Sequence, residues 1–102
     1  DSLQHSLLKL LNEDYQDGDF EKRAELAMDL KKNVRTLSDG CRNFDIGIKV
    51  YRNGVGKIYT SEGKEPKEFI LLLDFGNDKY EPLVYFDDDT ITYTFDKDSY
   101  LI

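Results

Sequence analysis

The feature that most constrains this chain is the run from Glu68 to Phe75, which holds no polar residue between Phe69 and Leu73. A half-exposed strand alternates apolar and polar residues, whereas a continuous apolar run of this length is typical of a strand covered on both faces. A buried helix segment is the alternative at this length. The phenylalanines and the Gly76-Asn77-Asp78 turn that follows favour the strand. We therefore expect a central strand that is covered on both faces.

Two helices are predicted before the strands begin. Leucines recur at helical spacing from Leu3, which indicates a helix that ends near Asn12. After a polar connector, Asp17 or Asp19 can cap a second helix. We expect this second helix to run from Phe20 to Leu37, with its apolar stripe on the sheet and Gly40 as its left-handed cap. The members of the stripe are Phe20, Ala24, Ala27, Leu30, Val34 and Leu37. Their heptad-like spacing leaves a coiled coil as an alternative.

The segment Phe44–Arg52 alternates strictly between apolar and polar residues, which predicts a strand with one buried face. The Asn53-Gly54 pair that follows is a strong hairpin signal. Its register has two solutions. A two-residue turn pairs Val50 with Lys57 on the core face, and a three-residue loop pairs Val50 with Ile58 instead. Because burial favours an apolar partner, we expect the second register.

Two further strands are predicted after the central one, at Tyr80–Phe86 and Thr90–Phe95. Pro82 lacks a backbone N–H, so the first should either lie at a sheet edge or start irregularly. The second should face the core with Ile91, Tyr93 and Phe95. Short connections favour sequential antiparallel pairing. We therefore predict one α+β domain over residues 1–102, helical over 1–40 and a meander of about five mostly antiparallel strands over 41–102.

Composition narrows the functional classes. The formal net charge is −7, so the surface has no net positive field for phosphate, and we expect no direct nucleic-acid binding. No apolar run approaches the ~20 residues of a membrane span, so we expect no membrane contact. The single cysteine, Cys41, excludes an intrachain disulfide and suits a reducing compartment, which indicates the cytoplasm.

Catalytic and cofactor signatures are weak throughout. His5 lies in the first helical turn without a nucleophile beside it, and we expect it to be a solvated surface residue. Cys41 lacks a neighbouring base, so we expect a small buried or half-buried residue. No glycine-rich phosphate loop is present. The sequence thus predicts a non-catalytic protein with no cofactor and no metal, although the Asp87–Asp89 run leaves cation binding open.

The C-terminal half interleaves carboxylates with tyrosines. Carboxylates steer association with a basic protein, and tyrosines supply rigid contact area. We therefore predict a partner-binding face made of Asp74, Asp78, Tyr80, Glu81, Tyr85, Asp87, Asp88, Asp89, Tyr93, Asp96 and Asp98.

These observations favour a binding protein that inhibits a basic partner. In size, charge and the order of helices before strands, the chain looks like a bacterial immunity protein, which covers a basic nuclease-type toxin. No motif carries this likeness, so no residue role follows from it. The alternative is a globular dimerisation or docking module at the end of a longer subunit, which leaves a homodimer open. The heptad-like stripe and the absence of an initiator Met before Asp1 support that alternative.

Overall fold

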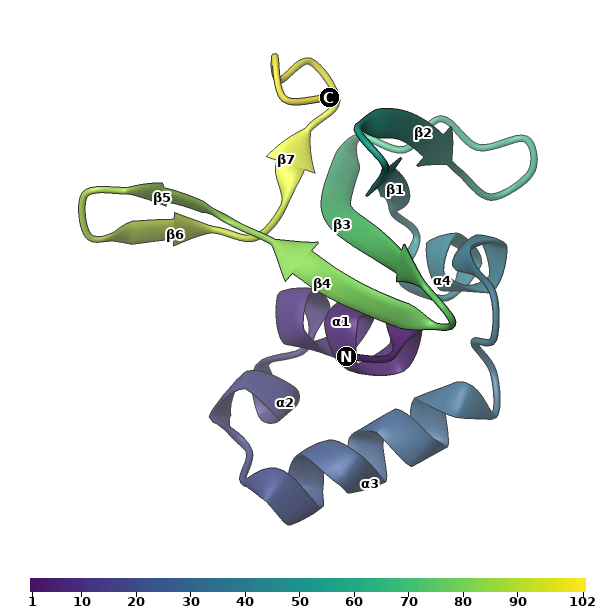
Figure 1. Ribbon diagram of the computed structural model, residues 1–102, viewed down its shortest axis with the longest axis vertical. Coiled ribbons are helices and arrows are strands. Elements are labelled where there is room, and N and C mark those ends of the chain that lie inside the picture. The colour runs from purple at the N-terminus through teal and green to yellow at the C-terminus, as the bar shows by residue number, and fades with distance from the viewer.

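The computed structural model describes residues 1–102, with four helices before seven strands (Figure 1). The helices are α1 (Leu3–Leu11), α2 (Glu13–Asp17), α3 (Phe20–Lys31) and α4 (Leu37–Phe44). The strands are β1 (Gly47–Arg52), β2 (Val55–Tyr59), β3 (Glu68–Gly76), β4 (Lys79–Leu83), β5 (Tyr85–Asp87), β6 (Thr90–Thr92) and β7 (Phe95–Asp96). The predicted α+β class, with a mostly antiparallel sheet of five strands, is confirmed.

The apolar run forms the central strand β3, as predicted. The strand order is β2-β1-β3-β4, and β7 pairs with β3 beyond the end of β4. The expectation of sequential pairing is wrong at two points, because β3 pairs in parallel with β1 instead of following β2, and β7 pairs with β3. This order places the most apolar strand inside the sheet and leaves β2, whose side chains are mostly exposed, at the edge.

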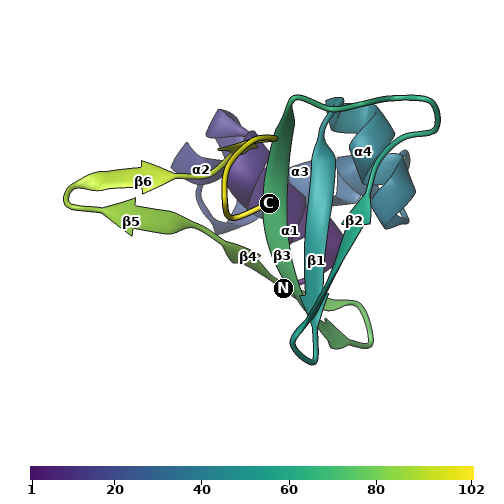
Figure 2. The ribbon, with the colours of Figure 1, turned by 90° about the horizontal axis from the view of Figure 1, so that it is seen from above.

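The main core lies between the helices and one face of the sheet. Its fully buried members include Ile48, Ile70 and Leu72 from the strands, with Leu3 and Leu7 from α1. Figure 2 shows the helices together on one side of the sheet. The helix α1 contacts β4, and α4 contacts β1 and β2. The main contacts of α3 are with α1 and α2, so the first half of the predicted stripe does not lie on the sheet, while its later members Leu30, Val34 and Leu37 reach the main core.

The other face of β3 is also covered over part of its length. Phe69 and Leu71 alternate with the core residues and are 6% and 7% exposed, and Phe95 of β7 is buried beside them. The C-terminal segment crosses this face (Figure 2). The Nζ of Lys49 donates a hydrogen bond of 2.7 Å to the carbonyl oxygen of Ile102, which holds the segment there. Coverage of both faces is thus confirmed for the first half of β3.

The predicted helix from Phe20 to Leu37 is in fact two helices. α3 ends at Lys31, and a capping box starts α4: the Thr36 hydroxyl accepts from the Asp39 N–H, and the Asp39 carboxylate accepts from the Thr36 N–H. Gly40 lies inside α4 and is not a cap. A Cβ there would lie 3.1 Å from the Leu7 Cδ1, so the glycine lets α4 pack closely on α1.

The hairpin register follows the turn and not burial. Val50 pairs with Lys57, and Asn53 and Gly54 have φ angles of 51° and 79° in a two-residue turn. Our expectation of a Val50–Ile58 pair is therefore wrong. Because β2 is an edge strand with little cover, Ile58 stays 48% exposed and burial has little weight in the choice.

Candidate partner-binding arm

The two predicted C-terminal strands are each interrupted, and the interruptions produce a separate hairpin. β4 ends at Leu83, and β6 ends at Thr92 before the chain returns to the main sheet at β7. Between these points, β5 and β6 pair only with each other. We call residues Tyr85–Thr92 the arm. Figure 1 shows the arm projecting away from the sheet and the helices. The prediction that Ile91 faces the core is wrong, since this residue is 41% exposed on the arm.

The tip of the arm is purely acidic. Asp87 pairs with Thr90, which leaves Asp88 and Asp89 in the turn. The arm holds no Lys or Arg, and none of the ion pairs in the protein involves its three aspartates. Asp88 adopts the left-handed conformation with a φ of 53°. Aspartate and asparagine are the side-chain-bearing residues that adopt this conformation most readily, so turn geometry accounts for Asp88 but does not require carboxylates at Asp87 and Asp89 as well.

One face of the arm is apolar and turns toward the helices. Phe86 and Ile91 are cross-strand partners, and Phe86 is 65% exposed. Both side chains line a groove of about 340 Å³ between the arm and the helices. The other lining residues are Lys9, Leu10, Gln16, Arg23, Glu81, Pro82, Val84 and Tyr93. An apolar side chain from another protein would find contact on both walls of this groove.

The opposite face of the arm carries Tyr85, which is 43% exposed. The phenol of Tyr100, followed by the carboxylate of Asp87, raises the pKa of Tyr85 above its ordinary value. A tyrosine phenol is neutral at physiological pH and can donate its hydrogen, and the upward shift of the pKa favours this form further. Tyr100 itself is 85% exposed, so two tyrosines are open to solvent where the arm meets the C-terminal segment.

The remaining predicted residues do not join the arm in one face. Asp74 and Asp78 lie at the β3–β4 turn, at the end of β4 away from the arm (Figure 1). The Asp74 carboxylate accepts from the Gly76 N–H at 2.8 Å and lies 3.9 Å from the Arg52 guanidinium. These contacts hold the Asp74 carboxylate at the turn.

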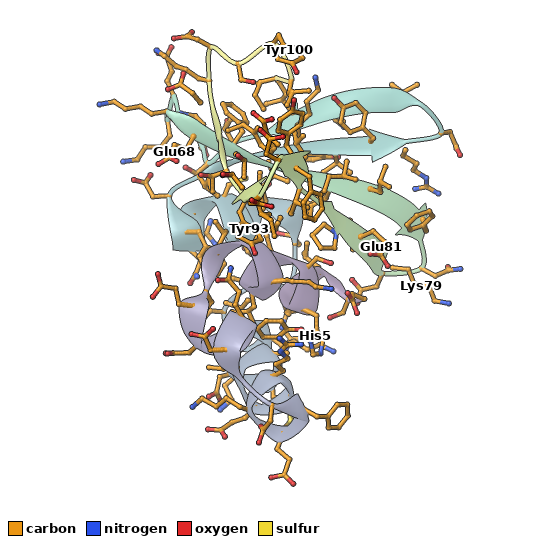
Figure 3. All side chains as sticks on the ribbon, turned by 90° about the vertical axis from the view of Figure 1, so that its left-hand side faces the viewer. His5, Glu68, Lys79, Glu81, Tyr93 and Tyr100 are labelled. Carbon is orange, nitrogen blue, oxygen red and sulfur yellow. The ribbon has the colours of Figure 1, made fainter.

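Two of the predicted tyrosines pack inward. Tyr80 and Tyr93 both lie against the main core cluster, and burial, followed by Asp74 and Asp78, raises the pKa of Tyr80. Glu81 is exposed on β4, while Asp96 and Asp98 belong to the C-terminal segment. Figure 3 shows Glu81 and Tyr100 well apart. The structure thus brings together Tyr85, Asp87, Asp88 and Asp89, places Glu81 and Tyr93 in the groove beside the arm, and disperses the rest.

Sequence reasoning missed two exposed residues of the arm, Phe86 and Ile91. Their signal was available, since Phe86 directly precedes the Asp87–Asp89 run and Ile91 follows it after Thr90. A strand that is buried at this position would hide both side chains. Their exposure follows only from the structure, in which β5 and β6 pair with each other and not with the main sheet.

The other reactive side chains serve the fold. The Nδ1 of His5 and the hydroxyl of Tyr15 are 2.6 Å apart, so His5 is half-buried and hydrogen-bonded, in contrast to the solvated residue expected. The Arg23 guanidinium lies 5.1 Å from the Tyr15 ring centre. Cys41 is fully buried and its thiol donates to the Tyr59 carbonyl oxygen. Burial raises the pKa of this thiol, which disfavours the reactive thiolate.

Comparison of the chain with protein-family models, curated proteins and solved structures finds no match. None of the helices combines the length and the apolar composition needed to cross a membrane. No group of three or more His, Cys, Asp and Glu side chains is arranged to hold a metal ion.

Proposed function

We propose that this protein is a non-catalytic inhibitor that binds a basic protein through its arm, in the manner of an immunity protein that blocks a nuclease-type toxin. The observation that carries the proposal is the arm itself: a projecting hairpin with unpaired carboxylates at its tip and exposed aromatic side chains behind them. Such a shape suits insertion into a cleft more than contact with a flat surface.

The negative charge of the tip suits a partner whose cleft is lined by basic side chains. A nuclease grips phosphate with Lys and Arg, and the carboxylates of Asp87, Asp88 and Asp89 can occupy those side chains. Because the aspartates have no ion pair within the protein, binding replaces water and not an internal partner. The net charge of −7 adds long-range attraction that accelerates the encounter.

The apolar side chains behind the tip supply lasting contact. Phe86 and Tyr85 lie on opposite faces of the arm, so both walls of a cleft can pack against an aromatic ring. Aromatic anchors of this kind carry much of the binding energy in protein interfaces. We place the encounter in the cytoplasm, because its reducing conditions do not affect a chain with one unpaired cysteine and no disulfide.

The test is capture of the partner from cells with three proteins: the natural sequence, the triple variant Asp87→Asn, Asp88→Asn and Asp89→Asn, and a matched control. The control, Glu25→Gln, Glu62→Gln and Glu65→Gln, removes the same charge from exposed positions off the arm. Association rates with the captured protein are then measured at low and high salt.

We expect the arm variant to associate roughly tenfold or more slowly at low salt, and the difference to shrink at high salt as charges are screened. The association rate of the control should fall much less. Equal rates for the natural sequence and a folded arm variant at low salt would refute the proposal, as would equal losses in the two variants.

A further inference from the structure

The helix α3 carries an apolar stripe that nothing in the protein covers. Phe20 and Met28 are 87% and 72% exposed. With Ala24 between them at steps of four residues, they lie on one face of the helix. Ala27, which is buried against the rest of the protein, follows Phe20 by seven residues and so lies beside it around the helix, whereas Met28 lies about 100° further round. The exposed Phe20 and Met28 therefore extend outward from the packed side of α3, which makes them a candidate interface.

The two ends of α3 carry opposite charge. Three exposed acidic residues, Asp17, Asp19 and Glu21, lie at or just before its N-terminal end. Three exposed basic residues, Lys31, Lys32 and Arg35, lie at or just after its C-terminal end. Of these six side chains only Lys32 is in an ion pair, with the exposed Asp29 at 3.5 Å, and the Asp19 carboxylate accepts from the Lys22 N–H as the N-cap of α3. Both ends are thus available to a partner of opposite charge.

A second copy of this chain fits the stripe and both ends at once. We propose that the protein forms a homodimer by antiparallel packing of α3 on α3 about a two-fold axis at Ala24. In this arrangement Phe20 of each copy packs on Met28 of the other, and the small Ala24 lets the helices approach. The acidic end of α3 in each copy meets the basic end of α3 in the other, and the antiparallel dipoles of the two helices attract each other. One patch serves both partners, as two-fold symmetry requires.

The charge of the helix argues against other occupants. Within Phe20–Lys31, the acidic residues Glu21, Glu25 and Asp29 balance the basic residues Lys22, Arg23 and Lys31. A neutral helix has no net attraction to anionic lipid or to nucleic acid. The charges that are separated lie in the residues that flank the helix, acidic before it and basic after it, and a copy that runs in the opposite direction would pair them. The helix is only about 18 Å long, so the interface is small and the dimer is expected to dissociate in the micromolar range.

The first test is sedimentation equilibrium across a concentration series. The natural sequence should pass from monomer to dimer, and Phe20→Ser should raise the dissociation constant by roughly tenfold or more. The control is Phe75→Ser, a comparable change at a residue that is 64% exposed on β3. It should leave the dissociation constant unchanged. Circular dichroism should show that both variants remain folded.

The second test uses charge exchange. The variant Asp17→Lys with Glu21→Lys has two basic ends, and the variant Lys31→Glu with Lys32→Glu has two acidic ends. Each alone should be monomeric where the natural sequence is dimeric, and an equal mixture should restore the dimer.

Three outcomes would overturn the proposal. The natural sequence could stay monomeric at about 1 mM. The control Phe75→Ser could dissociate the dimer while Phe20→Ser does not, which would place the interface on the sheet. The mixed charge variants could fail to associate while folded.

Discussion

The ring of Phe69 lies directly over Gly47, its parallel cross-strand neighbour, with no room for a side chain between them. A Cβ added at Gly47 would lie 2.3 Å from the Cε2 of that ring. Phe69 is 6% exposed and cannot swing away without displacing its surroundings. The glycine therefore allows β1 and β3 to pair while an aromatic ring closes the face of the sheet opposite the helices.

Substitution of Gly47 by alanine should consequently lower the free energy of unfolding by about 1–3 kcal/mol, as other overpacked sites do. Gly56→Ala is the control, because the nearest atom to its added Cβ would be Cε of the flexible Lys49 side chain, at 3.0 Å. Urea denaturation of both variants gives the comparison. Equal losses would show that the Phe69 ring yields as easily as a lysine side chain.

The start of α4 offers a second prediction, since no long apolar pattern supports this helix. The Thr36 hydroxyl accepts from the Asp39 N–H at 3.1 Å. Thr36→Ala should cost about 0.5–2 kcal/mol of unfolding free energy. Ser2→Ala is the comparison, because its hydroxyl accepts from the His5 N–H at a weaker 3.4 Å and should cost less. A larger loss at Ser2 than at Thr36 would contradict the role of the capping box.

Local patterns predicted the elements whose signals lie within one segment. The uninterrupted apolar run fixed β3 at the centre of the sheet, the leucine spacing placed α1, and Asp19 caps α3 as one of the two expected candidates. α4 was missed although Thr36 and Asp39 have the spacing of a capping box. Its Ser38-Asp39-Gly40 segment is equally typical of a helix end, and the tight packing of Gly40 on Leu7 is a tertiary contact that no local pattern contains.

Strand order and the arm depend on contacts between distant segments. The parallel pairing of β1 with β3 joins residues on either side of β2, and only the competition among strands for the covered position decides it. The acidic turn between aromatic residues was visible in the sequence, which grouped Tyr85 with Asp87–Asp89, and the fold keeps these residues together. Asp74 and Tyr80 were grouped with them because they alternate in the same way, while the fold places them at the other end of β4.

A third prediction concerns acid stability. Burial, and then the positive N-terminus, lowers the pKa of His5 below its ordinary value of 6.5. The neutral imidazole is therefore favoured in the folded state, so its contribution is complete above the unfolded pKa and is lost as the pH falls through the folded one. The free energy of unfolding should fall as the pH is lowered from about 7 toward 5.

The variant His5→Gln should flatten this part of the pH profile. Asp39 contributes to stability over a separate pH range. Hydrogen bonds from the backbone N–H groups of Arg35 and then Thr36 lower its pKa, so its contribution to the free energy of unfolding disappears only at more acidic pH. Urea denaturation across the pH series separates the two. An unchanged slope between about pH 7 and 5 in the His5→Gln variant would assign the acid sensitivity to other groups.

The last prediction separates the shape of the arm from its charge. Asp88 holds a left-handed backbone conformation, with a φ of 53°, that glycine adopts without strain. Asp88→Gly should therefore preserve the β5–β6 pairing and raise the free energy of unfolding by about 0.5–1 kcal/mol, both from relief of strain and from reduced repulsion among neighbouring carboxylates. If the arm meets a basic cleft, the same variant should associate more slowly with the captured partner at low salt.

Asp88→Asn is the matched control, because asparagine tolerates the left-handed conformation nearly as well and keeps the size of the side chain. Both variants lose one charge and should lose association rate to the same extent, while only the glycine variant gains chain flexibility. Stopped-flow association at low salt and urea denaturation give the two readouts. A slower rate for Asp88→Gly alone would assign the effect to flexibility of the arm. Slower association in both variants, without loss of stability, is the result that the acidic tip requires.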